Sequence, residues 1–219
     1  MILVPVKHLK HAKQRLSALL TPLERQALAA AMLEDVLLAL AACSHISKIA
    51  LVTGDPAAVR LAQQFSFEVI PDRENFGETE AVAMATRVCE GRGERETLVL
   101  PADIPLVTPA EVEQIFAAAP AEGTVMVPSR DDRGSNAVLR RPAALFPLNF
   151  GDDSFQPHLR AAQFTGTPCV VLRAEGIALD VDRPFDLKVL VGRPGSTRSQ
   201  QLVRDWDIGQ RLAAAAVPA

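Results

Sequence analysis

The sequence predicts an α/β fold with a mostly parallel sheet. Short apolar runs mark five buried strands along the first part of the chain, at residues 2–6, 49–53, 67–70, 97–100 and 125–128. Continuous apolar runs of this length are typical of strands that are covered on both faces. Helix patterns separate these runs, and strands that alternate with helices form parallel βαβ units with right-handed crossovers. With 219 residues, the chain is long enough for one sizeable domain of this kind.

Proline after a capping residue marks the start of three predicted helices. Thr21 and Thr108 are each followed by Pro and stand three residues before a Glu, which is the pattern of a capping box. Asp55 is also followed by Pro. These signals predict helices that begin at residues 22, 56 and 109.

Weaker patterns follow in the second half of the chain. Residues 136–140 and 168–173 fit two more strands. A glycine turn and Ser154 as N-cap should begin a helix that runs through residue 162. Another helix should cover residues 184–191.

The boundaries of the domain follow from these elements. We expect one domain at residues 1–191, after which Gly192 opens a linker rich in Gly, Pro, Ser and Thr. A short helix near residues 200–216 should end the chain. This tail could pack on the domain or on a partner subunit, so a homodimer is one expectation.

Composition excludes several classes of protein. The net charge of −3 gives no reason to expect a nucleic-acid partner. The 3 cysteines are widely spaced and form no paired motif, which argues against a zinc site and a disulfide framework and for a reducing compartment. No apolar run is long enough to span a membrane, and the N-terminus lacks the pattern of a signal peptide. We therefore expect a cytoplasmic protein.

A carboxylate follows one of the buried strands. Pro101 should end the strand at 97–100, and Asp103 comes directly after it. Ligands of open α/β sheets gather outside the carboxyl ends of the strands. Asp103 is therefore well placed to hold a divalent metal against phosphates, although it could instead cap the turn before the helix at Thr108.

Basic residues follow the first strand. Lys7, Lys10, Lys13 and Arg15 lie within nine residues of one another. A lysine supplies a point charge and an arginine a bidentate fork, so such a loop suits a triphosphate. The alternative is a solvated basic turn without a ligand.

Two further sites lie late in the chain. Asp180 and Asp182 are two residues apart, so in an extended chain they point the same way and could face one metal. Asp182 could instead cap the helix that follows. Gly151 and Ser154 precede a helix, and a helix N-terminus of this kind can bind an anion. Capping alone is the alternative role for Ser154.

The basic loop, Asp103 and the pair Asp180/Asp182 together are what a nucleotidyl transferase needs. Its transition state spreads negative charge over the α-phosphate and the leaving pyrophosphate, and a metal with Lys or Arg stabilises that charge. The attacking group is already an anion, so the enzyme must chiefly hold two anions together and in line.

The order and spacing of several motifs over residues 1–190 resemble those of a known family. The motifs are VPVKHLKHAKQRL, TPLERQALAAAMLEDVL, LVLPADIPL, GSNAVLRRP, FPLNFGDDSFQPHL and ALDVDRPFDL. The sequence is similar to the CofC/FbiD guanylyltransferases of deazaflavin coenzyme (F-420) biosynthesis. The FG-x-x-SF-x-x-HL stretch and ALDVD are the specific part of this resemblance, since ADIPL is shared by many related enzymes.

The resemblance implies a Rossmann-like three-layer α/β/α domain of the nucleotide-diphospho-sugar (GT-A-like) transferase fold. It also implies a reaction in which the phosphate of a three-carbon phospho-acid attacks GTP and releases pyrophosphate. The acid would be 2-phospho-L-lactate, phosphoenolpyruvate or 3-phosphoglycerate, and the cofactor would be Mg²⁺.

The resemblance assigns roles by position in the motifs. The nucleotide would contact Pro5, Lys7, Lys13, Arg15, Gly77 and Glu78. The catalytic groups would be Lys7, Lys13, Arg15 and Asp103. The Mg²⁺ ligands would be Asp103, Asp180 and Asp182. The phospho-acid would contact Ser135, Asn136, Gly151 and Ser154. His158 could touch the acid or lie at the surface.

Two positions depart from the family pattern. Residues 77–81 read Gly-Glu-Thr-Glu-Ala where the family has Gly-Leu-Asn-x-Ala, near the base in related enzymes. A carboxylate there could accept hydrogen bonds from guanine, or it could indicate another nucleotide. Glu78 or Thr79 could also simply cap the following helix. Arg183 stands where Thr commonly caps the last helix, at a cost of roughly 1 kcal/mol.

Three other functions fit the same residues. A nucleotidyltransferase of this fold could act on a sugar phosphate or a molybdenum cofactor. A non-catalytic relative could bind a nucleotide, but the three aspartates argue against it. A glycosyltransferase would share the strand and the carboxylates, although the basic loop suits a triphosphate better than a sugar nucleotide.

Overall fold

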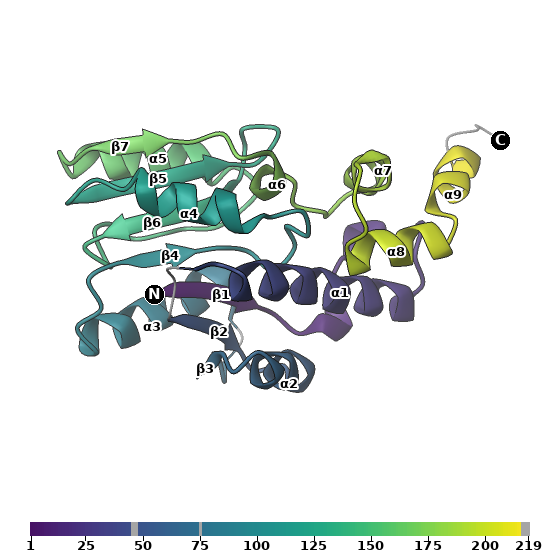
Figure 1. The fold of residues 1–219 in the computed structure, drawn as a ribbon, viewed down its shortest axis with the longest axis horizontal. Coiled ribbons are helices and arrows are strands. Elements are labelled where there is room, and N and C mark those ends of the chain that lie inside the picture. Colours follow the sequence, from purple (N-terminus) through teal and green to yellow (C-terminus); the bar gives the residue numbers. More distant parts are fainter. Residues whose placement is uncertain (45–47, 75, 216–219) are drawn as a thin grey trace.

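One seven-stranded sheet organises the chain. The computed structural model describes residues 1–44, 48–74 and 76–215 (Figure 1). The strand order is β3-β2-β1-β4-β6-β5-β7. The strands are β1 (Ile2–Val6), β2 (Ile49–Thr53), β3 (Glu68–Pro71), β4 (Thr97–Val99), β5 (Gly123–Pro128), β6 (Ser135–Arg141) and β7 (Cys169–Val171).

The sheet is mostly parallel, as predicted. Strands β3, β2, β1 and β4 run parallel to one another, and β7 runs parallel to β5. Strand β6 pairs antiparallel with both β4 and β5. Strand β6 therefore lies between β4 and β5. The last predicted βαβ unit, from β4 to β5, joins two parallel strands that are not neighbours in the sheet.

Helices cover both faces of the sheet, which confirms the three layers. The helices are α1 (Pro22–Ala41), α2 (Pro56–Gln64), α3 (Glu78–Gly91), α4 (Pro109–Ala117), α5 (Phe155–Phe164), α6 (Glu175–Ala178), α7 (Pro184–Gly192), α8 (Arg198–Asp205) and α9 (Ile208–Ala215). Two 3₁₀ turns, η1 (Leu9–His11) and η2 (Gln14–Leu16), follow β1. Helix α6 has no counterpart among the predicted elements.

Strand β1 shows why the apolar runs are continuous. Ile2 and Val4 pack in one core cluster with α1, α2 and α4, whereas Leu3 packs in a second cluster with α3 and α5. Successive side chains of a strand point to opposite faces, so a strand between two helix layers needs apolar residues throughout.

The predicted caps with proline are confirmed. Thr21 and Thr108 both form complete capping boxes with the Glu three residues later. Asp55 accepts hydrogen bonds from the N–H groups of Ala57 and Ala58. Its second oxygen accepts from the N–H of Leu9 at 3.0 Å, so the cap of α2 also holds the basic loop after β1.

Three possible side-chain caps are not observed. Gly77 occupies the N-cap of α3, and neither Glu78 nor Thr79 caps that helix. Ser154 stands at the N-cap of α5 with helical backbone angles and makes no capping bond. Asp182 does not cap α7, because the carboxylate of Asp186 accepts from the N–H groups of Asp182 and Arg183. This Asp186 contact offsets the missing Thr at position 183.

The C-terminal tail forms two helices where one was predicted. The chain breaks between α8 and α9 at Asp207, whose φ of 51° lies in the left-handed region. The predicted helix end at 216 lies outside the described residues. Helix α8 lies beside α1 (Figure 1) and contacts α7, and α9 contacts α7 and α8; Val203 and Ile208 share a core cluster with Leu28 and Met32 of α1. The homodimer stays a prediction.

A buried carboxylate on α1 anchors this tail. Asp35 is 6% exposed and accepts hydrogen bonds from the N–H groups of Arg198 and Ser199 at 2.8 and 3.0 Å. Asp35 thus accepts from two backbone N–H groups that have no partner within α8. The bonded residues are 163 and 164 positions apart in the chain, so the sequence does not predict this contact.

Replacing this carboxylate should destabilise the protein. We expect Asp35→Ala to lower the free energy of unfolding by about 1–3 kcal/mol, because two buried N–H groups lose their acceptor. The matched control is Glu34→Ala, which removes a partly exposed ion pair with Arg198 and should cost under about 1 kcal/mol. Denaturant unfolding measures both. Equal losses in the two variants would contradict the anchoring role of Asp35.

Candidate active site

A cavity of about 770 Å³ lies at the carboxyl ends of β1 and β4, and a second hollow of about 420 Å³ adjoins it. The walls come from the loop after β1, the start of α3, the loop after β4, the β5–β6 turn, the loop before α5 and residues 180–186. Eleven of the thirteen predicted site residues line the larger cavity: Lys7, Arg15, Gly77, Glu78, Asp103, Ser135, Asn136, Gly151, Ser154, Asp180 and Asp182. The other two, Pro5 and Lys13, line the smaller one.

Lys13 lies where three segments meet. Its φ of 56° is left-handed. Its ammonium Nζ is 2.5 Å from Oδ2 of Asp103 and 3.8 Å from Oδ1 of Asp182. Burial lowers the pKa of Lys13, but the two carboxylates outweigh that effect and the pKa is raised overall. Lys13 is therefore a buried, charged group that joins the loop after β1 to the loop after β4.

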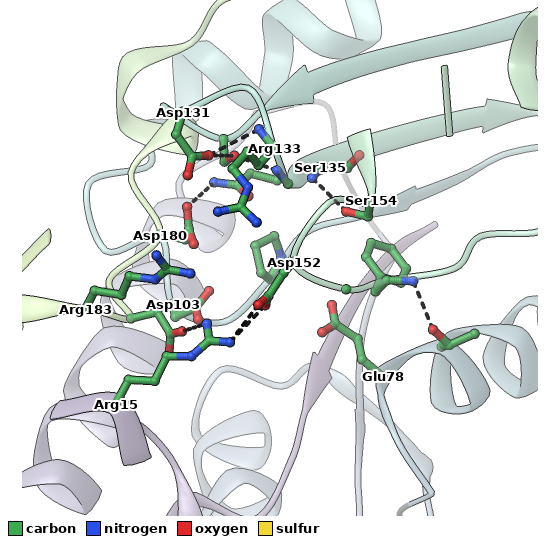
Figure 2. A pocket seen from close by; sticks show the side chains of 18 of the residues that line it. Arg15, Glu78, Asp103, Asp131, Arg133, Ser135, Asp152, Ser154, Asp180 and Arg183 are labelled. Carbon is green, nitrogen blue, oxygen red and sulfur yellow. Dashed lines mark hydrogen bonds and ion pairs between the residues drawn. The ribbon is translucent and has the colours of Figure 1, made fainter. Parts of the chain in front are cut away.

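Arg15 bridges two acidic side chains at the rim (Figure 2). Nη1 donates to Asp182 at 2.6 Å, and Nη2 donates to both oxygens of Asp152 at 2.9 and 3.0 Å. Among the predicted basic residues, Lys7, Lys13 and Arg15 reach the cavities, whereas Lys10 is exposed and lines neither. The basic loop is thus a structured part of the site rather than a solvated turn.

Negative charge accumulates beside Lys13. Burial raises the pKa of Asp180 in spite of a 2.9 Å hydrogen bond from Asn136 Nδ2, and the charge of Asp103 adds to the rise. Burial raises the pKa of Glu78 to about 7; Asp103 adds to this rise, while Lys7 and Lys13 oppose it. A cation bound in this cavity would relieve the repulsion among these carboxylates.

The donor set fits Mg²⁺ in part. Mg²⁺ in phosphoryl-transfer sites is held by one or two carboxylates, with substrate phosphates and waters as the other ligands. Asp103, Asp180 and Asp182 supply such oxygens. In the described part of the chain, however, no three acidic, His or Cys side chains gather around one point, and the Lys13 ammonium lies between Asp103 and Asp182. Two carboxylates are the most that the observed arrangement offers one ion.

Of the four residues predicted to bind the phospho-acid, three lie on the cavity wall with no side-chain bond to a described carboxylate, and Asn136 is bonded to Asp180. The Ser135 N–H donates to Ser154 Oγ at 3.1 Å, so the two serines lie together on the wall of the cavity. A side chain at Gly151 would meet no protein atom within 4 Å, and the glycine keeps that wall open. Asn136 uses its amide on Asp180 and on the carbonyl of Ile177, so it orients a carboxylate.

Sequence reasoning missed several residues of the site. Asp152 and Arg133 both line the cavity: Asp152 binds Arg15, and Arg133 of the β5–β6 turn binds Asp153, which does not line the cavity, at 2.6 and 3.1 Å. The FGDDSF motif is the available signal, but its local pattern predicts only a turn and a helix start. Both expectations for His158 are wrong, because the ring is 1% exposed and lies behind the cavity wall.

Comparison with known proteins tests the predicted family. The model of the family described as "Guanylyl transferase CofC like" matches residues 1–213. The chain belongs to this family. The predicted resemblance is confirmed, and with it the class of nucleotidyltransferases.

Individual relatives agree with this assignment. The CofC-like chain is 35% identical to a phosphoenolpyruvate guanylyltransferase of Sphaerobacter thermophilus over 86% of this chain and 91% of that protein. It is 30% identical to a 2-phospho-L-lactate guanylyltransferase of Methanothermobacter thermautotrophicus over 92% of this chain and 88% of that protein.

The fold is confirmed by a solved structure. A proposed nucleotide-diphospho-sugar transferase of Desulfovibrio desulfuricans G20 superimposes with a TM-score of 0.78 at 20% identity, over 96% of each chain. None of the described helices of the CofC-like chain combines the length and apolarity needed to cross a membrane.

The raised pKa of Glu78 gives a prediction for stability. Its pKa is about 7 in the folded protein and 4.5 for the free group, so folding favours the protonated form and stability falls as pH rises from about 4.5 to 7. Glu78→Gln should therefore be more stable than the wild type at pH 8, by about 1–3 kcal/mol, and equally stable below pH 4.5. Denaturant titrations at both pH values measure this, with the neighbouring Glu80→Gln as control. No gain at pH 8 would contradict the burial of a repelled carboxylate.

Proposed function

We propose that this CofC-like chain transfers GMP from GTP to the phosphate of a three-carbon phospho-acid and releases pyrophosphate. The observation that carries the proposal is the division of the cavity. Lys13 lines the smaller hollow and Lys7 lines both hollows, whereas Ser135, Ser154 and Gly151 line the larger cavity, where Arg15 binds Asp152. The lysines suit a triphosphate, and the serines with the glycine suit a small anion.

Phosphoenolpyruvate is our first choice of acceptor, since the relative named above at 35% identity carries that name and the one at 30% is named for 2-phospho-L-lactate. 2-Phospho-L-lactate and 3-phosphoglycerate are the other candidates. A role in the biosynthesis of deazaflavin coenzyme F-420 is part of the same proposal and rests on the family resemblance.

The chain's own residues would do most of the work by position and charge. An oxygen of the acid's phosphate attacks the α-phosphorus of GTP, a P–O bond forms, and the bond to the β-phosphate breaks as pyrophosphate leaves. The attacking oxygen is already anionic, so no general base is needed. Lys13 and Arg15 would neutralise the charge that develops on the α-phosphate and on pyrophosphate.

Mg²⁺, held by Asp103 with Asp180 or Asp182, would supply charge neutralisation at the phosphates. Lys13 and Arg15 are bound to these carboxylates and to Asp152 in the described structure. The triphosphate and a metal would therefore exchange partners within one network of charges: the cations turn to the phosphates, and the carboxylates turn to the metal.

Pyrophosphate release tests this function. We expect turnover from purified protein and Mg²⁺ when four nucleoside triphosphates are crossed with the three phospho-acids, and only for GTP with one acid. Turnover with another base would assign a different nucleotide and implicate residues 77–81. No pyrophosphate in any combination, from folded protein, would contradict the proposal.

Removing the charge of Asp103 should stop the reaction. We expect Asp103→Asn to lower kcat by about 100-fold or more, because a metal ligand and the partner of Lys13 are lost together. Asp153→Asn, at an exposed carboxylate that binds Arg133, is the matched control and should stay within about threefold of the wild type. A near-normal rate for Asp103→Asn in Mg²⁺ would exclude its role.

Ser154→Ala tests the division of the cavity. Loss of the hydroxyl should raise the KM for the phospho-acid by about tenfold, since a hydrogen bond to a charged group is worth 1.5–3 kcal/mol. The KM for GTP should change much less. Steady-state kinetics with each substrate varied in turn measure both constants, and an equal rise in the two would count against separate subsites.

A further inference from the structure

His158 is a buried ring directly behind the wall of the cavity. It lies on α5 and is 1% exposed. The backbone N–H of Asn149 donates to its Nε2 at 2.8 Å, and its Nδ1 is 2.9 Å from Oγ of Ser135. The ring therefore touches two walls of the cavity: the loop before α5 and the start of β6.

The proton on this ring has one available position. A backbone N–H can donate but not accept, so Nε2 of His158 must present its lone pair to Asn149. Burial, with the charge of Arg140, lowers the pKa of His158 to about 4, so the ring is neutral near pH 7. A neutral imidazole has one N–H, which must then be on Nδ1 and must donate to Ser135 Oγ.

This bond determines what Ser135 can do. Its Oγ accepts from the ring, which leaves its own hydroxyl proton to donate elsewhere. Ser135 lines the cavity, and within the described residues that proton meets no acceptor. The same holds for Ser154, whose Oγ accepts from the N–H of Ser135. Two hydroxyl groups from residues that line the cavity, shown side by side in Figure 2, thus each keep a proton that no described residue accepts.

We propose that His158 is a positioning residue that fixes the Ser135 hydroxyl as a hydrogen-bond donor to an anionic oxygen of the phospho-acid. Carboxylate and phosphate oxygens are acceptors, so a hydroxyl already oriented as a donor binds them without reorienting. His158 itself does not touch the substrate. The inference rests on the proposed function of the cavity.

Two substitutions separate the two bonds of the ring. In His158→Asn, the amide nitrogen takes the place of Nδ1 and can still donate to Ser135, but the side chain is too short to accept from Asn149. In His158→Gln, the longer side chain places its amide oxygen near the position of Nε2 and can still accept from Asn149, but the donor to Ser135 is lost. His158→Phe keeps the ring volume and loses both bonds.

The kinetic test compares these variants with the wild type. We expect the KM for the phospho-acid to rise about tenfold in His158→Gln and His158→Phe, and by less than about threefold in His158→Asn. The KM for GTP should stay within about threefold in all three. Thermal melts check that each variant is folded. A merely structural role would instead raise both KM values, in parallel with the loss of stability.

The position of the proton is measured on the wild type, so this arm does not depend on the folding of a variant. Long-range ¹H–¹⁵N spectra of protein labelled at its 4 histidines should show one neutral ring with the proton on Nδ1 at pH 7, and that signal should be missing in His158→Asn. A proton on Nε2, or a Gln variant that binds the acid as well as the Asn variant, would overturn the inference.

Failure of the proposed function is distinguishable from failure of this inference. Wild-type protein that neither turns over the acid nor binds phosphoenolpyruvate by calorimetry would refute both. An active wild type with unchanged kinetics in His158→Gln and His158→Phe would refute only the role of His158.

Discussion

The pair of Lys13 and Asp103 is the contact on which the rest of the site depends. A charged ammonium that is 8% exposed is stable only beside an opposite charge, and Asp103 provides one at 2.5 Å. The contact holds the loop after β1 against the loop after β4, 90 residues away in the chain. Asp182 Oδ1 lies 3.8 Å from the same nitrogen, so the ALDVD segment also contacts Lys13. The substrates that we propose would bind where these three segments meet.

The antiparallel strand explains how the proposed phospho-acid site comes to face that point. The parallel strands end at one edge of the sheet, and β6 begins at that edge because it runs the opposite way. Val99 of β4 pairs with Val138, so the start of β6 at Ser135 extends past the end of β4, toward Asp103. One reversed strand therefore lets a strand start and several strand ends contribute to the same cavity.

Local signals in the sequence were sufficient for much of this structure. The apolar runs, the Thr-Pro-x-Glu starts and the Asp55 cap depend on neighbours within four residues, and all are observed. The predicted site residues also reach the cavities, since strand ends of a parallel sheet share one edge. Metal binding by the three aspartates stays a prediction.

Contacts between distant residues were not predictable in the same way. Ser154 looks like an N-cap by type and position, yet it accepts from Ser135, 19 residues away. Asp152 binds Arg15, which is 137 residues away in the chain. From the sequence, His158 fits a surface or substrate-binding residue, but in the fold it is buried against Ser135 at the start of β6. The break between α8 and α9 depends on the left-handed backbone of Asp207, and this position holds neither a proline nor a glycine that would predict a break. In each case tertiary contacts outweigh the local pattern.

The identity of the product tests the central claim most directly, namely that the cavity brings two anions together for one bond to form between them. ³¹P NMR of a reaction with GTP and phosphoenolpyruvate should show two coupled phosphorus signals of a new diphosphate linkage, with free pyrophosphate in equal amount. Nucleotide breakdown with the acid unchanged would contradict the account, because the second anion would then have no part in the reaction.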